Sequence, residues 1–358
     1  MKKFTKMWAI AACALFAGTA AVNAEDYTWK FVTAGDATTY AIRSDGSLWS
    51  WGWNEKGQGG NGVSERTATP TLADGNRVWK KAVGGKAYGF FLAEDGSLWA
   101  AGTHEGGVQG TNDGIDHKVL TRIGTDNDWA DMACSRFWGY SGFAIKTNGT
   151  LWAWGKNSAG QLGIGNTQAQ TAPVQVGADM DWKQVAAGCS SVLALKTDGS
   201  LWGWGFNMYS ELFGHEGKQL SPVRLGSETD WEQVVVIDFR AYAVKKDGTL
   251  WAWGDNANNL LGFNTPTEEE TTAEGNPVEV VTVPQITAPT HVTSIEGKVL
   301  TISGCENTLS VATGTDGVIE KVWMLGSNTD GALGDGKGLG NGNKDIPFAK
   351  VPVHPSLK

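Results

Sequence analysis

The sequence has few of the residues on which metalloenzymes and disulfide-rich proteins depend. Its 358 residues include 4 cysteines and 5 histidines, and no two of these have the spacing of a metal site. Three cysteines follow residue 24, namely Cys134, Cys189 and Cys305, and this odd number leaves at least one thiol outside any internal disulfide. We therefore expect small buried thiols, no bound metal and no cofactor.

Positive charge is also scarce. Lys and Arg number 29 against 38 Asp and Glu, which gives a formal net charge of −9. Because an acidic surface repels phosphate backbones, we expect no nucleic acid partner. The acidity otherwise suits the solubility of a secreted protein.

Long apolar runs are absent after residue 22. The first 24 residues combine three lysines, an apolar run over 7–22 and a small-residue ending, which is typical of a secretory signal peptide. We therefore expect a secreted, periplasmic or cell-surface protein with no membrane span. The alternative is a lipid anchor at Cys13, since Ile10-Ala11-Ala12-Cys13 resembles a bacterial lipoprotein box.

Glycine and tryptophan are abundant instead, with 49 and 18 residues. They recur in a unit that is best preserved as TNGTLWAWGKNSAGQLGIGN, residues 147–166. An Asn-Gly or Asp-Gly step between apolar runs predicts a two-residue hairpin turn with positive φ at both positions. Six such steps, at intervals of 50, 53, 50, 49 and 69 residues, end at Gly46, Gly96, Gly149, Gly199, Gly248 and Gly317. Ser or Thr and then Leu-Trp follow all of them but the last.

A second marker precedes each turn, an aromatic residue that opens a short apolar strand. It is degraded to His291 in the sixth repeat, and elsewhere it is Trp29, Trp79, Trp129, Trp182 and Trp231. A period near 50 made of short strands predicts an all-β fold, a β-propeller of four-stranded blades, in which the recurring tryptophans pack between blades. The propeller spans 25–358, with repeats at about 29–78, 79–128, 129–181, 182–230, 231–290 and 291–358. The first strand of each repeat ends in small residues, so we place it innermost in its blade.

The motif NGTLWAWGKNSAGQLGIG resembles the regulator of chromosome condensation repeat, whose family includes secreted bacterial β-lactamase-inhibitor proteins. The resemblance covers essentially the whole chain after residue 24 and implies the fold more than the function. Family members commonly have seven blades, so seven is the alternative to the six repeats that we count. Chromosome-associated members act as exchange factors on a nuclear GTPase, an activity that we do not expect of an exported acidic chain.

Two connections of each repeat are expected on one face, those after its first and third strands, and they vary from repeat to repeat. Variable loops on a rigid scaffold are where binding residues concentrate. Aromatic and arginine side chains that break the period suit a protein interface, although the aromatic insert at 135–141 has the alternative of plugging a channel. The candidate binding residues are Lys86, Tyr88, Arg136, Phe137, Trp138, Tyr140, Asp238, Phe239, Arg240 and Glu306.

The sequence predicts an exported, non-enzymatic binding scaffold that presents this face to a protein or a glycan. One alternative is a carbohydrate-active lyase or hydrolase, in which carboxylates such as Asp36, Asp238 and Glu306 form an acid/base pair in a central channel. No serine lies in a nucleophile-elbow motif, so we expect no catalytic residue of that kind. The other alternative, inhibition of a secreted enzyme such as a β-lactamase, rests on the resemblance.

Overall fold

The computed structural model describes residues 28–136, 139–257, 260–262, 269–271, 277–279, 285–305, 308–326 and 346–351. The regular structure in these residues is almost entirely β-strand, with a 3₁₀ turn, η1, at Glu105–Gly107. The chain divides into two compact units, each described by itself. The first comprises the residues up to Ser158 with Thr167–Trp182, and the second comprises Ala159–Asn166 with the residues from Lys183 onward.

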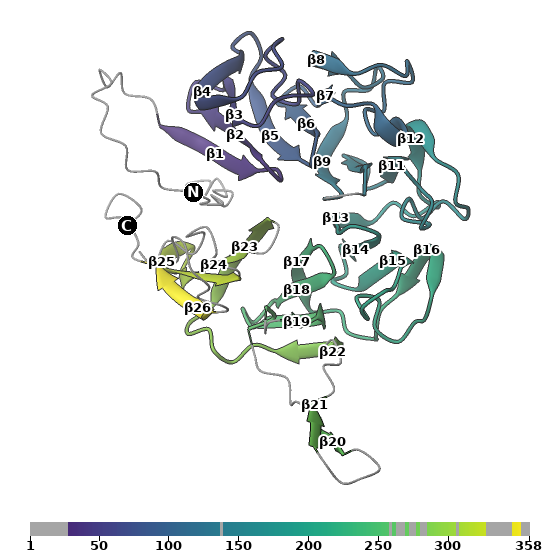
Figure 1. The fold of residues 1–358 in the computed structure, drawn as a ribbon, viewed down its shortest axis with the longest axis vertical. Coiled ribbons are helices and arrows are strands. Elements are labelled where there is room, and N and C mark those ends of the chain that lie inside the picture. The colour runs from purple at the N-terminus through teal and green to yellow at the C-terminus, as the bar shows by residue number, and fades with distance from the viewer. Residues whose placement is uncertain are drawn as a thin grey trace, which may run out of the picture. The chain divides into compact units, whose positions relative to one another are not determined.

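Six sheets are described, each with four strands in an antiparallel up-and-down order (Figure 1). Three lie in the first unit: β1 (Trp29–Ala34), β2 (Thr38–Arg43), β3 (Leu48–Gly52) and β4 (Thr67–Asp74); β5 (Trp79–Gly84), β6 (Tyr88–Ala93), β7 (Leu98–Gly102) and β8 (His117–Arg122); β9 (Trp129–Cys134), β10 (Ser141–Lys146), β11 (Leu151–Gly155) and β12 (Gln170–Gln175).

The next three sheets follow in the second unit, where β13 opens with the last residue of the first unit. They are β13 (Trp182–Ala187), β14 (Ser191–Lys196), β15 (Leu201–Phe206) and β16 (Lys218–Arg224); β17 (Trp231–Ile237), β18 (Arg240–Lys245), β19 (Leu250–Asp255) and β22 (Gln285–His291); β23 (Val299–Cys305), β24 (Thr308–Thr315), β25 (Val318–Gly326) and β26 (Ile346–Val351). A separate two-stranded ladder, β20 (Glu269–Thr271) with β21 (Pro277–Glu279), lies in the long connection before β22. The predicted all-β propeller of four-stranded blades is confirmed, with six such sheets in the described residues.

Five of the six glycine-ended turns are three-residue loops, so the predicted two-residue geometry is wrong for them. In the first sheet Gly46 N donates to Arg43 O (2.9 Å) and Arg43 N donates to Ser47 O (3.0 Å). Gly46 has a φ of +87°, whereas Asp45 does not adopt positive φ. The Oδ1 of Asp45 instead accepts from Ser47 N (2.9 Å). A type I turn followed by a left-handed glycine is therefore closed by the aspartate side chain.

The same aspartate explains why Ser or Thr and then Leu-Trp follow these turns. Asp45 Oδ1 accepts from Ser47 Oγ (2.6 Å), and Ser47 Oγ accepts from Trp49 Nε1 (2.8 Å). The other four turns repeat this chain of hydrogen bonds. The sixth turn lacks the hydroxyl and is the two-residue turn that we expected, with φ of +49° at Asp316 and +80° at Gly317.

A lysine at the end of the second strand joins the two tryptophans of its sheet to the linker before that sheet. Lys245 Nζ lies 4.8 Å from the ring centroid of Trp231 and 4.7 Å from that of Trp251. It also lies 2.8 Å from Glu228 Oε1 and 3.3 Å from Asp230 Oδ2. The third sheet repeats this lysine clamp with Lys146, Trp129, Trp152, Asp126 and Asp128. These four tryptophans are therefore structural, as predicted for tryptophans that follow the repeat period.

The first strands of neighbouring sheets contact one another within each unit, as expected for the inner strands of blades. Space there is too small for side chains, since a Cβ added to Gly188 would lie 2.3 Å from Asp238 O. At one end of the first sheet, Trp53 N donates to Ala37 O (2.8 Å), which joins the connections after the first and third strands. At the other end the hairpin turn meets the linker to the next sheet, where Trp79 N donates to Gly46 O (2.9 Å).

The sixth sheet departs from its predicted start. His291 is the last residue of β22 and pairs with Trp251, so it does not open a first strand. That strand is β23, and its opening residue Val299 donates N–H to Gly248 O (2.9 Å), as the tryptophan openers do to the equivalent glycines. The prediction from the sequence chose His291 as the first residue of this strand because the tryptophan that marks the position in the other repeats is replaced by Val299.

Candidate functional site

The connections between first and second strands are the predicted binding loops. In the first unit they cover 35–37, 85–87 and 135–140, apart from residues 137 and 138. Arg136 Nη1 donates to the carbonyl oxygen of Ala34, the last residue of β1 (3.4 Å). The loop of the third sheet therefore reaches the end of the first sheet.

Two candidate residues in or next to these loops are core side chains. Tyr88 is fully buried, its hydroxyl donates to Ser135 O (2.5 Å), and its ring centroid lies 5.9 Å from that of Tyr140. Tyr140 is 4% exposed. Burial raises the pKa of both phenols. A partner cannot reach either ring, so the assignment of Tyr88 and Tyr140 to binding is wrong. The two rings hold the connection of the third sheet against the second sheet.

Lys86 and Arg136 are half-buried in these connections, and their role in binding stays a prediction. Phe137, Trp138 and Glu306 lie outside the described residues.

In the second unit, three candidate residues lie in or next to the connection between β17 and β18 of the fifth sheet. Asp238 has a φ of +54°, and its Oδ1 accepts from Cys189 Sγ (3.7 Å). Arg240 is 7% exposed, and its Nε lies 3.6 Å from Asp255 Oδ2 in a buried ion pair. The assignment of Arg240 to binding is therefore wrong, because its charge is engaged inside the sheet. Phe239, between them, is half-buried.

Phe239 is joined by two residues that the sequence analysis missed. The ring centroids of Phe239 and Tyr209 lie 4.9 Å apart, and the neighbouring Met208 is 46% exposed. Met208 and Tyr209 belong to the connection between β15 and β16, where the repeat's Asn-x-x-Gly-Gln-Leu-Gly reads NMYSELF, residues 207–213. That departure from the repeat is the sequence signal by which Met208 and Tyr209 could have been identified as candidates. We call Met208, Tyr209 and Phe239 the Met208 patch.

Beneath the Met208 patch, a carboxyl replaces the glutamine of the repeat. Glu211 is fully buried, its Oε2 accepts from Tyr209 N (2.8 Å) and its Oε1 accepts from Ser191 Oγ (3.2 Å). Gln161 makes the first of these contacts in its own repeat, accepting from Ala159 N (2.9 Å). Burial, assisted by the nearby Asp255 carboxylate, raises the pKa of Glu211 to about 7.

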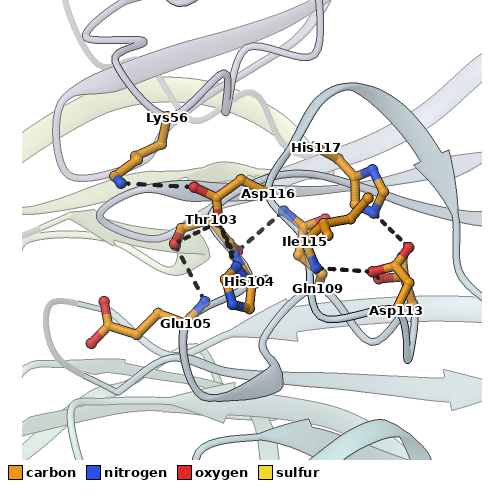
Figure 2. A network of polar contacts seen from close by, with 10 residues as sticks. Lys56, Thr103, His104, Glu105, Gln109, Asp113, Ile115, Asp116 and His117 are labelled. Atoms are coloured by element: carbon orange, nitrogen blue, oxygen red, sulfur yellow. Dashed lines mark hydrogen bonds and ion pairs between the residues drawn. The ribbon is translucent and has the colours of Figure 1, made fainter.

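A polar network lies in the connection between β7 and β8 (Figure 2). His104 Nδ1 lies 2.7 Å from Asp116 Oδ1, and Lys56 Nζ lies 3.7 Å from Asp116 Oδ2. His117 Nε2 lies 2.8 Å from Asp113 Oδ2. Burial opposes ionisation of Asp116, but hydrogen bonds from the backbone N–H and imidazole of His104 outweigh it and lower the pKa of that carboxyl. These pairs brace a glycine-rich loop against its neighbours.

The described residues contain no group of three or more His, Cys, Asp or Glu side chains that could hold a metal ion. Of the three carboxylates proposed as an acid/base pair, Asp36 belongs to the first unit, Asp238 to the second, and Glu306 lies outside the described residues. The enzymatic alternative therefore stays a prediction. Within the described part of the chain, no helix has the length and apolar character to cross a membrane.

Comparisons with known proteins agree with the geometry of the sheets. A sequence model described as "Regulator of chromosome condensation (RCC1) repeat" matches residues 45–92 and 148–195, and a second model of this repeat matches 29–58. Each longer match begins in the turn before a third strand and ends in the second strand of the next sheet.

The chain contains RCC1 repeats over residues 29–92 and 148–195.

Because each of the two longer matches supplies two strands to one sheet and two to the next, the repeat itself links sheets that are consecutive in the chain. The Ultraviolet-B receptor UVR8 of Arabidopsis thaliana is 30% identical over 163 residues, which cover 45% of this chain and 37% of that protein. Human Protein RCC2 is 27% identical over 150 residues, or 41% of this chain and 19% of that protein. The chain thus matches well under half the length of these relatives.

Among solved structures, human WBSCR16 is 18% identical with a TM-score of 0.74, over 92% of this chain and 82% of that one. The structure of Kap60 bound to yeast RCC1 (Prp20) gives 18% identity and a TM-score of 0.71, over 91% and 75% of the two chains. At these identities the likeness shows the shared fold.

Proposed function

We propose that this RCC1-repeat propeller is an exported, non-enzymatic scaffold that binds a protein partner through its loops after the first and third strands. The observation that carries the proposal is the Met208 patch. It combines an exposed methionine with two aromatic rings in contact, at positions that depart from the repeat.

The chemistry of the Met208 patch suits protein recognition. Aromatic residues dominate binding hot spots, because each buries a large area while losing little conformational freedom. Methionine adapts its shape to a partner and packs well on aromatic rings. The repeat has no structural need for these side chains, since the equivalent positions of the third repeat hold Ser158 and Ala159. A binding role accounts for the presence of all three side chains of the Met208 patch at positions that depart from the repeat.

The other properties of the chain support the same class of partner. The net charge of −9 disfavours nucleic acid and favours a partner with a neutral or basic surface. The solved yeast RCC1 (Prp20), which shares this fold, is bound to another protein, Kap60. The signal-peptide pattern over 1–24 supports an extracytoplasmic partner, and a secreted enzyme that the scaffold inhibits is the narrower form of this proposal.

Affinity capture with matched variants tests the proposal. The chain without residues 1–24 is immobilised and exposed to the cell envelope and medium of its source, and retained proteins are identified. The combined variant Met208→Ala, Tyr209→Ala, Phe239→Ala should lose at least one protein that the parent retains. Met180→Ala is the control, because Met180 is 61% exposed and lies beside the hairpin turn of its sheet, at the other end from the loops.

Loss of the partner with the combined variant but not with Met180→Ala supports the proposal. Identical captured sets for all three proteins, at unchanged melting temperatures, would refute it. Treatment of the captured material with glycosidases separates a protein partner from a glycan, since only a glycan-dependent capture is lost.

A further inference from the structure

The sixth sheet lacks the tryptophan that opens the first strand of the other five. Val299 takes its place, because Val299 N donates to Gly248 O (2.9 Å) just as Trp231 N donates to Gly199 O (3.2 Å). Val299 is 4% exposed. The backbone of the repeat is therefore retained at this position while the indole ring is absent.

Two aliphatic neighbours of the missing ring are also retained, whereas Thr313 pairs with Val299 where Lys245 pairs with Trp231. Trp231 belongs to a buried cluster with Leu201 and Leu225, and Leu225 N donates to Leu201 O (2.8 Å). Val299 belongs to a buried cluster with Leu250 and Val292. Val292 N likewise donates to Leu250 O (2.9 Å). The equivalent residues thus frame an indole ring in one sheet and a valine in the next.

A cavity of about 340 Å³, partly open to solvent, lies beside Val299 in the second unit. Its apolar lining comes from the half-buried Ile295 and from Leu250, Val292 and Val299, each of which is no more than 4% exposed. Its volume lies at the lower end of the range of about 300–1,000 Å³ that is usual for small-molecule sites. It lies at the hairpin-turn end of the sheets, away from the Met208 patch, so it is separate from the proposed partner surface.

Polar groups at the cavity are already held in place. Asp247 Oδ1 accepts from Thr249 N (2.9 Å) and Thr249 Oγ1 (2.7 Å). The ring of His291 stacks on Trp251 with centroids 5.3 Å apart and an interplanar angle of 28°. Lys298 is exposed at the rim, and its aliphatic stem lies against Gly248. An apolar floor with a lysine and an ordered carboxylate at the rim suits a planar aromatic ring that carries a hydrogen-bond donor.

We propose that this cavity binds an indole ring supplied in trans, in the place that the repeat's own tryptophan fills in the other sheets. Apolar cavities left by a missing large side chain can take up aromatic molecules, because water solvates them poorly. The ring can come from a small molecule or from a tryptophan side chain of a peptide. Both sources share the indole chemistry that the cavity selects.

Isothermal titration of the full chain with three probes tests the proposal: indole, free tryptophan and N-acetyltryptophanamide. Indole should bind with a Kd on the order of 1 mM or below, given the affinity that a ligand of this size can reach. Tighter binding of N-acetyltryptophanamide than of free tryptophan points to a peptide source, and the reverse order to a small-molecule source.

Two variants that fill the cavity decide whether the probe binds there. Val299→Trp restores the repeat, and Ile295→Trp fills the space from the linker if the first variant does not fold. Either should weaken indole binding by about tenfold or more, since both occupy the space of the ring. Val318→Trp adds a tryptophan at a position that is 55% exposed in the same sheet and should leave binding unchanged.

If no binding is detected at indole concentrations several times the expected Kd, the inference is overturned. Binding that neither filling variant weakens would overturn it as well. Neither outcome bears on the Met208 patch, whose capture experiment is separate.

Discussion

Glu211 is the buried carboxyl that stands where other repeats have glutamine, and Glu211→Gln is the most informative single change in the chain. The carboxyl of Glu211 is fully buried and accepts hydrogen bonds from Tyr209 N and Ser191 Oγ. Glutamine can keep both contacts, accepting from the backbone through its oxygen and donating to the hydroxyl through its nitrogen. The substitution therefore removes a titrating group with little change of shape.

The magnitude follows from the pKa of Glu211, which burial raises from 4.5 to about 7. A group whose folded pKa lies above its unfolded value contributes fully to stability below the unfolded pKa and loses that contribution as the pH rises through the folded pKa. At about 1.4 kcal/mol per pKa unit, ionised Glu211 costs the folded protein about 3 kcal/mol at pH 8. Near pH 4 the carboxyl is protonated in both states and costs nothing.

Urea unfolding of the parent and of Glu211→Gln between pH 4 and pH 8.5 measures this cost. The variant should be no more stable than the parent at pH 4 and gain about 3 kcal/mol by pH 8, most of it between pH 4.5 and pH 7. Glu216→Gln controls for the loss of one charge, because Glu216 is exposed in the same connection. A stability difference between Glu211→Gln and the parent that stays constant across the pH range would refute the reasoning.

Two further predictions concern the scaffold. Lys245→Met should destabilise the fold by about 1–2 kcal/mol at pH 7, because it removes the cation from between two indole rings and two carboxylates. Burial lowers the pKa of Lys245, but Glu228 and Asp230 outweigh it and raise that pKa, so the parent's advantage should persist through pH 10 and fade above it in pH-dependent unfolding. Gly124→Ala should cost about 1 kcal/mol, since its φ is +62° but nothing lies near an added Cβ. Gly96→Ala should cost clearly more in the same denaturation assay, because its added Cβ would lie 2.1 Å from Asn127 O, and equal costs would contradict this account.

The sheets could be predicted well from the sequence, because the hydrogen bonds that recur in each repeat join residues that are close in the chain. Asp45, Ser47 and Trp49 are joined within five residues, so their spacing is visible without any knowledge of tertiary contacts. The turn geometry was predicted wrongly for the same five turns, because positive φ at the aspartate was assumed where its side chain closes a three-residue loop instead. His291 was misassigned because the marker tryptophan is valine in that repeat.

The candidate site was harder to predict, because a side chain in a variable loop can point to solvent or into the next sheet. Tyr88, Tyr140 and Arg240 all break the repeat as a binding residue would, yet each is buried by a partner from outside its own loop. Phe239 was chosen on the same ground and does lie against Tyr209, the sequence neighbour of the exposed Met208. The repeat period shows which positions depart from the repeat, but it does not show whether their side chains point to solvent or into the core.

By itself the sequence determined the all-β class, the four-stranded repeat and the structural role of the tryptophans, because those features depend on contacts within about twenty residues. Only the tertiary structure decided which loop residues are exposed, which carboxyl is buried and where an indole ring is missing. Those properties depend on which residues pack against each side chain, and such contacts join residues that lie from 15 to about fifty positions apart in the chain.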